Sequence, residues 1–193
     1  MSAISRPVSR FAGLAFAFAA VFAAAFAVPA VQAQTPTGTP HLMLTLEDGV
    51  VDIELLPALA PKHVERIITL TNEGFYDGVV FHRVIDGFMA QTGDPTGTGM
   101  GGSSYPDLQA EFTNTESFQR GVLGMARSQD PNSANSQFFI TYADASFLDG
   151  QYTIFGKVVS GMEFVDALEK GPESANGQVE NPDKIISAKI EYR

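Results

Sequence analysis

One arginine in a short apolar segment is the residue best placed to do chemistry in this sequence. Arg83 lies in a β-branched and aromatic run, and the strand period predicts that its side chain shares a face with Phe81 and Ile85. A turn at residues 86–87 leads into two more apolar side chains and an amide: Phe88, Met89 and Gln91. A guanidinium donates several hydrogen bonds without releasing a proton. The segment therefore predicts a fixed positive charge beside an apolar surface.

Two later segments carry side chains of the same kinds. Residues 121–140 bring a second amide and an aromatic pair: Gln137, Phe138 and Phe139. Residues 146–158 add aromatic and branched side chains next to turn residues. We expect Phe138 and Phe155 to belong to the core of the domain, because not every aromatic side chain near a site lines it.

The composition excludes several other chemistries. The chain of 193 residues contains no Cys, which excludes disulfides, Cys-ligated zinc and cysteine nucleophiles. A formal net charge of −10 provides no basic surface to neutralise a phosphate backbone, so nucleic-acid binding is not expected. No serine lies in a nucleophile elbow, and the histidines have no metal-ligand spacing: His41, His63 and His82. We therefore expect no metal and no cofactor.

A glycine-rich segment matches a dinucleotide-binding pattern but lacks its context. Residues 97–102 read G-x-G-x-x-G, yet Asp94-Pro95 precede them and residues 103–106 contain a further proline. The pattern binds a pyrophosphate only where it follows a strand and opens a helix. A loop at the edge of a site is the interpretation that we favour.

Residues 1–33 have the organisation of a secretory signal peptide. Arg6 and Arg10 come first, residues 11–28 are uncharged and apolar, and the segment ends on Ala33 with small residues at the cleavage positions. The alternative is a retained membrane anchor, because the apolar run is about as short as a spanning helix can be. We expect cleavage, a flexible tail at residues 34–40, one domain at residues 41–193, and export to the periplasm, or secretion from a host with a single membrane.

The rest of the sequence predicts short strands and two helices. Residues 41–46 and 50–55 form a hairpin, and Pro61 opens a helix that Gly74 ends. A second, shorter helix is expected around residues 162–168. The other expected strands are residues 79–85, 88–92, 121–126, 137–141, 152–159 and 186–191. About eight strands with two helices favour an all-β sandwich or closed barrel over alternating strands and helices.

Taken together, the motifs resemble the cyclophilin family of peptidyl-prolyl cis/trans isomerases, in particular its exported bacterial members. They are Phe81-His82-Arg83, GFM-x-Q at residues 87–91, SQFFI at residues 136–140 and Leu148-Asp149-Gly150. The resemblance spans residues 41–192. It implies an all-β fold with minor α content: a closed eight-stranded antiparallel β-barrel capped by two helices. The active face would lie outside, because side chains fill the interior of a small barrel.

The resemblance also implies roles for individual residues. Arg83 matches the catalytic arginine of the family. The peptide-binding residues that it implies are Phe88, Met89, Gln91, Ala126, Arg127, Gln137, Phe139, Phe147, Leu148 and Tyr152. Two of these depart from the best-known pattern, since Phe147 stands where tryptophan is usual and Tyr152 where histidine is usual. Because an indole N–H is lost, cyclosporin binding is expected to be weak.

These residue types suit rotation about an Xaa-Pro bond. The barrier is about 18–20 kcal/mol because the nitrogen lone pair is delocalised into the carbonyl, and a guanidinium near that nitrogen would localise it. We therefore expect a monomeric enzyme that acts on unfolded, Pro-containing exported polypeptides and does not bind the membrane after signal cleavage. The alternative is a non-catalytic proline-peptide binding module or holdase chaperone that uses the same groove.

Overall fold

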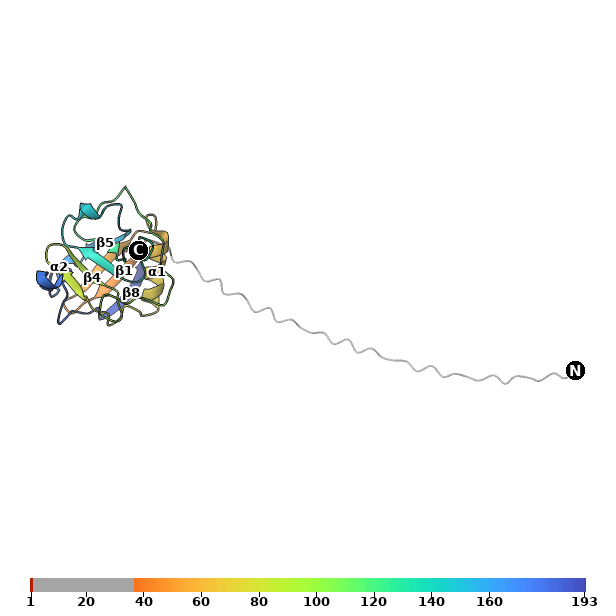
Figure 1. Ribbon diagram of the computed structural model, residues 1–193. Coiled ribbons are helices and arrows are strands. Elements are labelled where there is room, and N and C mark those ends of the chain that lie inside the picture. Colours follow the sequence, from red (N-terminus) through yellow and green to blue (C-terminus); the bar gives the residue numbers. More distant parts are fainter. Residues whose placement is uncertain (2–36) are drawn as a thin grey trace. The chain divides into compact units, whose positions relative to one another are not determined.

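The computed structural model describes Met1 and residues 37–193 (Figure 1). Residues 2–33 of the predicted signal peptide, and residues 34–36 of the predicted tail, lie outside the described residues. Within the described part of the chain, no helix is both long enough and apolar enough to cross a bilayer. The strands are β1 Pro40–Thr45, β2 Val50–Leu55, β3 Arg83–Ile85, β4 Met89–Thr92, β5 Val122–Met125, β6 Phe138–Thr141, β7 Ile154–Ser160 and β8 Ser187–Tyr192. The helices are α1 Pro61–Asn72 and α2 Met162–Asp166, with 3₁₀ turns at Ser146–Leu148 and Glu173–Ala175.

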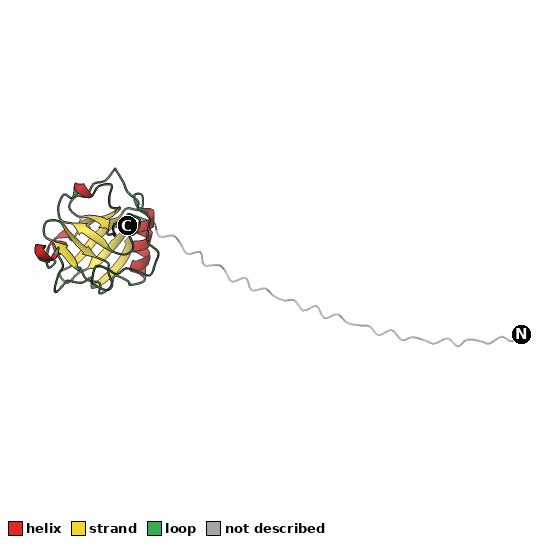
Figure 2. Cartoon of the chain, in the orientation of Figure 1, coloured by secondary structure: helices red, strands yellow, loops and turns green. Residues whose placement is uncertain are grey.

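The strands form one curled antiparallel sheet, with helices at its periphery (Figure 2). The strand order is β3-β4-β6-β5-β7-β2-β1-β8, and among the described strands β3 does not pair with β8. The segments that lead into these two strands are joined by isolated bridges, such as Val80 to Lys184, and by single backbone hydrogen bonds, such as Phe81 N–H to the carbonyl oxygen of Asp183 at 2.8 Å. The predicted closed barrel is therefore not supported. The sheet is an open half-barrel, because the edge strand β3 is only 3 residues long and forms no ladder with the other edge strand, β8.

The first strand begins slightly earlier than the sequence predicts. Pro40 is the first residue of β1, and the backbones of Thr39 and Arg193 donate hydrogen bonds to each other at 2.7 and 3.1 Å. Residues 39 and 40, which were predicted to belong to a flexible tail, are therefore paired with the backbone at the end of β8.

Helix α1 is held at its N-terminus by a carboxylate that lies far along the chain. Pro61 opens the helix as predicted, but Ala60 offers no side-chain cap. Glu111 instead accepts hydrogen bonds from the backbone N–H groups of Lys62 and His63 and from His63 Nδ1. The helix ends at Asn72, just before Gly74, whose φ of 72° stops it.

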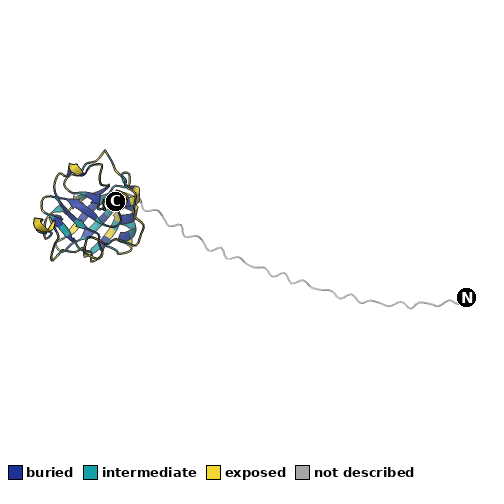
Figure 3. Ribbon diagram, viewed as in Figure 1, coloured by how far each residue is buried: buried dark blue, intermediate teal, exposed yellow. Residues whose placement is uncertain are grey.

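Alternate residues of the strands face two separate apolar clusters. The larger cluster fills the concave side of the sheet and includes Phe138 and Phe155, as predicted. Buried residues dominate the strands, and exposed ones fall mainly on loops and the short helices (Figure 3). Phe81 also belongs to this core, so the prediction that it shares a face with Arg83 is wrong. The strand starts only at Arg83, and the period of two does not extend back to residue 81.

The smaller cluster lies on the outer face of the sheet. Its buried members are Met89, Phe118, Phe139, Ala145, Leu148 and Ile154. Each strand residue among them neighbours a residue of the larger cluster in sequence, as the strand period requires. The outer face therefore carries apolar side chains that are separate from the main core and could line a binding site.

Candidate active site

The pairing register brings four predicted or adjacent positions into one row across the outer face. Arg83 of β3 lies opposite Gln91 of β4, and Gln91 lies opposite Phe139 of β6. Phe139 in turn lies opposite Gly124 of β5. Residues that are up to 56 positions apart in sequence thus share one face because the sheet aligns them.

Gly124 makes room for the aromatic floor of the site. A Cβ at this position would come closer than 3.0 Å to the rings of both Phe139 and Phe118. Those two rings stack with centroids 5.6 Å apart. The glycine is therefore required by the close approach of the Phe139 ring to the β5 backbone.

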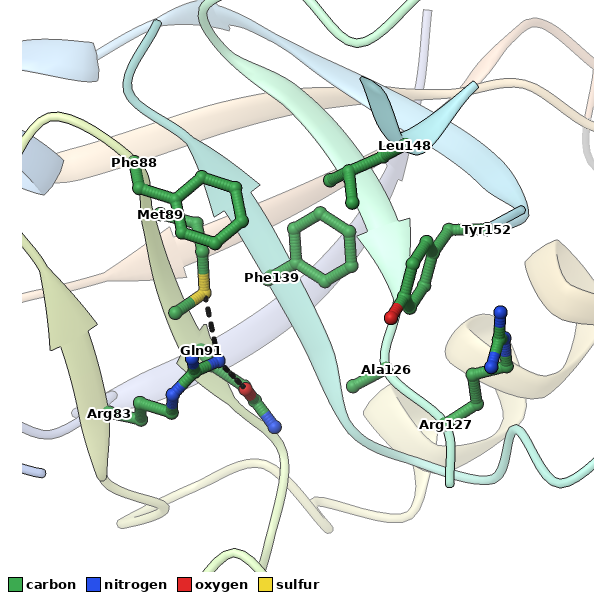
Figure 4. Close-up of a pocket in the computed structure, with 9 residues that line it drawn as sticks. All are labelled: Arg83, Phe88, Met89, Gln91, Ala126, Arg127, Phe139, Leu148 and Tyr152. Atoms are coloured by element: carbon green, nitrogen blue, oxygen red, sulfur yellow. Dashed lines mark hydrogen bonds between the residues drawn. The ribbon is translucent and has the colours of Figure 1, made fainter. Parts of the chain in front are cut away.

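A pocket of about 200 Å³ opens beside this row (Figure 4). It is smaller than the roughly 300–1,000 Å³ that accommodates drug-sized ligands, and its size suits a single ring-sized side chain. Arg83 and Gln91 lie on one side, Tyr152 and Arg127 on the other, with Phe139 between them (Figure 4). The lining residues are Arg83, Phe88, Met89, Gln91, Ala126, Arg127, Phe139, Leu148 and Tyr152.

Three hydrogen bonds fix the guanidinium of Arg83. Its Nε donates to the carbonyl oxygen of Asn176 at 3.0 Å, and its Nη2 donates to Asn176 Oδ1 at 3.0 Å. Its Nη1 donates to Gln91 Oε1 at 3.2 Å. The remaining Nη1 contact is Met89 Sδ at 3.9 Å, a weak acceptor on the pocket wall. One N–H of the fork is thus directed at the pocket and free to bind a stronger acceptor.

Arg83 is not neutralised by an acid. None of the ion pairs found among the described residues includes it, and its sequence neighbour Asp86 does not pair with it. Burial lowers the pKa of Arg83 from its usual value, and the nearby Tyr152 partly opposes that shift. The side chain remains a cation at neutral pH.

Side-chain amides connect Arg83 to the neighbouring glycine-rich loop. Gln91 Nε2 donates to Gln137 Oε1 at 2.9 Å. Gln137 Nε2 donates to the carbonyl oxygens of Gly99 at 3.1 Å and Gly101 at 2.7 Å. Gln137 does not line the pocket beside Arg83, but it lines an adjoining hollow of about 430 Å³.

The opposite wall is made rigid by a second arginine. Arg127 lies over the ring of Tyr152 with its Cζ 4.4 Å from the ring centroid. Its Nε and Nη2 both donate to the carbonyl oxygen of Gln151, at 3.1 and 2.8 Å. Tyr152 also meets Phe139 edge to face at 5.7 Å. The wall and the floor of the pocket thus contact each other directly.

The structure places Phe147 differently from the other predicted site residues. It is 64% exposed, does not line the pocket, and packs against Phe88 at a centroid distance of 5.5 Å. It lies in the 3₁₀ turn Ser146–Leu148, where Leu148 takes the inward position. Apolar spacing does not separate these two neighbours, because a short 3₁₀ turn has no reliable apolar period.

Two supporting residues were not predicted. Asn176 holds Arg83, and Phe118 lies beneath Phe139. Asn176 has a φ of 52°, in the left-handed region that asparagine tolerates, and it directly precedes Gly177. The Asn-Gly pair could have marked a turn, but nothing local indicates that the turn contacts Arg83.

The glycine-rich loop is organised by Asp94 and opens no helix. The carboxylate of Asp94 accepts hydrogen bonds from four backbone N–H groups, those of Thr96, Thr98, Gly99 and Gly101, at 2.6–3.1 Å. Burial alone would raise the pKa of Asp94, but these hydrogen bonds outweigh it and lower the pKa to about 2. The G-x-G-x-x-G segment is a loop next to the pocket, as its sequence context predicts, whereas its organisation around the Asp94 carboxylate was not predicted.

The histidines lie in separate places. His41 Nδ1 binds Asp52 and His63 Nδ1 binds Glu111, at 2.7 and 2.6 Å. His82 is buried and forms no side-chain hydrogen bond with the described residues. No group of three or more His, Asp or Glu residues suited to a metal ion occurs in the described part of the chain.

The geometry is thus an open half-barrel with a small pocket on its outer face that combines a cationic side chain with an apolar floor. Residues 41–190 match the family described as cyclophilin type peptidyl-prolyl cis-trans isomerase/CLD. A protein from Brucella suis described as a probable peptidyl-prolyl cis-trans isomerase is 55% identical over 195 residues, covering 92% of this chain and 98% of that protein. A protein of the same description from Brucella abortus is 54% identical over the same length and coverage.

Solved structures agree with this assignment. A cyclophilin type peptidyl-prolyl cis-trans isomerase from Cryptosporidium parvum superposes with a TM-score of 0.74 at 33% identity, covering 80% of this chain and 99% of that chain. The same protein was also crystallised in the presence of the dipeptide Ala-Pro. This chain belongs to the cyclophilin family, and it is a cyclophilin-type peptidyl-prolyl cis-trans isomerase.

Proposed function

We propose that Arg83 is the catalytic residue and that it stabilises the twisted state of the Xaa-Pro bond. The observation that supports this is the guanidinium with one N–H directed along the pocket wall and no carboxylate partner among the described residues. With the proline ring in the pocket, that N–H can approach the prolyl nitrogen as it becomes pyramidal, or the substrate carbonyl. Neither interaction requires proton transfer.

The residues of this pocket can provide the stabilisation of the twisted Xaa-Pro bond that catalysis requires. A 10⁵-fold acceleration corresponds to about 7 kcal/mol. A charge-assisted hydrogen bond contributes roughly 1.5–3 kcal/mol. The rest comes from holding the ring in an apolar pocket and gripping the neighbouring peptide backbone, so that binding favours the twisted state over either planar one. Backbone at Ala126 and Arg127 is the proposed partner of that extended peptide.

The proposed substrates are unfolded, Pro-containing chains that have been exported. The support is the signal-peptide pattern of residues 1–33. The similarity to the Brucella proteins, which covers 92% of this chain, also extends N-terminal to residue 41. N-terminal sequencing of the protein from an envelope extract tests this proposal. A start at residue 34 supports cleavage and release, whereas retention of residues 11–28 would mean a membrane-tethered domain.

Turnover must be distinguished from simple holding of peptides. Exchange NMR on a short Ala-Pro peptide separates the two, because an isomerase produces cis/trans exchange cross-peaks at a substoichiometric enzyme concentration. A holdase shifts and broadens peptide signals without exchange. Exchange peaks in the presence of the wild-type domain support the enzyme, and binding without them would support the chaperone alternative. Sedimentation of the same sample tests the proposed monomer.

Cyclosporin is proposed to bind weakly. Phe147 lacks the indole N–H, and its ring stands outside the pocket, against Phe88. Titration with cyclosporin tests this, with Phe147→Trp as the variant that returns the donor. A tight complex with the wild-type protein would refute the proposal.

A further inference from the structure

We infer that Asp94 is a positioning residue for Arg83, acting through the glycine-rich loop and two glutamine amides. The inference deepens the proposed function and rests on the catalytic role of Arg83. Asp94 is 0% exposed and does not line the pocket, so it cannot touch a bound peptide. It is nevertheless the common acceptor for the loop whose carbonyl groups contact Gln137.

The first step is the orientation of the loop. The carboxylate of Asp94 draws the N–H groups of Gly99 and Gly101 toward itself, at 2.6 and 3.0 Å. The carbonyl oxygens of the same two glycines are left to face Gln137. A loop that contains four glycines in six residues would otherwise have many accessible conformations.

The second step is the orientation of the first amide. Carbonyl oxygens only accept hydrogen bonds, so the two loop carbonyls require that the NH₂ group of Gln137 faces the loop. Its oxygen must then face Gln91. The flip state of Gln137 is thus determined by the loop rather than by the pocket.

The third step transfers this orientation to Arg83. Because Gln137 presents oxygen, Gln91 must present its NH₂ group to it and its own oxygen to Arg83 Nη1. If the amides were flipped, an NH₂ group would face a guanidinium N–H, and two donors would oppose each other. The loop carboxylate therefore decides whether Nη1 is held in place next to the pocket.

The test is Asp94→Asn, which keeps the size of the side chain but replaces one acceptor oxygen by a donor. We expect kcat to fall about tenfold with KM changed less than about twofold, the size expected when one hydrogen bond is misdirected. The ¹⁵Nε–H signal of Arg83 should shift in the same variant. Asp52→Asn is the matched control, since Asp52 is also buried, at 7% exposed, but binds His41 and Arg193. It should keep the wild-type kcat.

A double-mutant cycle shows whether the effect passes through Gln137. In a Gln137→Met background the amide is absent, so adding Asp94→Asn should cause no further fall in kcat. Equal effects in both backgrounds would overturn the inference. If Asp94→Asn does not fold, Thr96→Val removes a hydroxyl donor to the same carboxylate, at 2.8 Å, and should lower kcat in the same direction.

The outcomes separate this inference from the proposed function. Full activity of an Arg83→Ala variant would refute the catalytic role on which the inference rests. Loss of activity in Arg83→Ala, together with wild-type kcat and an unchanged Arg83 signal in both loop variants, would refute only the role of Asp94.

Discussion

Removing the guanidinium of Arg83 should slow turnover far more than it weakens peptide binding. In Arg83→Ala the pocket keeps its apolar floor, because Met89 and Phe139 belong to a cluster that does not depend on the arginine. The variant loses the N–H at the pocket wall and leaves Asn176 Oδ1 and Gln91 Oε1 without their donor. Both acceptors are near the surface, where water can replace that donor.

The size of the effect follows from the bond that is lost. A charge-assisted hydrogen bond formed mainly in the twisted state is worth about 1.5–3 kcal/mol, so kcat/KM should fall about 10- to 150-fold. Arg83→Lys keeps the charge but cannot reproduce the fork that binds both oxygens of Asn176, and it should lie between wild type and alanine.

A protease-coupled assay on an Xaa-Pro peptide measures this directly, with peptide affinity determined separately by calorimetry. Arg120→Ala is the matched control, because Arg120 pairs with Asp166 at 2.6 Å and does not line the pocket. It should retain the wild-type rate. If Arg83→Ala binds peptide normally and keeps its rate, or if it loses binding and rate in equal proportion, the proposed transition-state role is wrong.

Three further predictions concern the pocket and its loop. Gly124→Ala should raise KM and lower stability by about 1–3 kcal/mol, because its Cβ would displace the ring of Phe139; calorimetry and thermal unfolding measure both, and unchanged values contradict the packing argument. Phe147→Ala should change kcat/KM less than about threefold on short peptides, since the ring lies outside the pocket; a larger loss means that peptide reaches it. Asp94, whose pKa is lowered to about 2, should stabilise the fold above about pH 4 and lose that contribution, about 2 kcal/mol, as the pH falls to about 2. The gap between wild type and Asp94→Asn in urea unfolding should therefore narrow over that range, and a constant gap would contradict the assignment.

Local patterns predicted the elements that depend on local chemistry. The first hairpin and the start of α1 at Pro61 follow from alternation, a turn and a preformed φ angle. The closure of the barrel was not predictable in this way, because it depends on the pairing of two distant edges. The prediction that Phe81 shares a face with Arg83 was wrong for a related reason, because side chains alternate only within a paired strand and β3 begins at Arg83.

The site was predictable where side chains come from the motifs themselves. Nine of the eleven predicted site residues line one pocket, and a tenth, Gln137, accepts a hydrogen bond from Gln91 of that pocket. The role of Asn176 was not predictable, because it lies 93 residues from Arg83 and no local pattern indicates that the two residues are in contact. Asp94 was seen only as part of a loop, since its role depends on how that loop folds back on it.

Different side chains form the core of the domain and line the candidate pocket, because they lie on opposite faces of the sheet. The larger cluster packs the interior of the half-barrel, whereas the smaller cluster on the outer face contributes Met89, Phe139 and Leu148 to the candidate pocket. Substitutions in the second set can reshape ligand preference while leaving the first untouched. Such a scaffold can diversify its specificity over evolutionary time, and an engineer could randomise the convex side without first redesigning the interior.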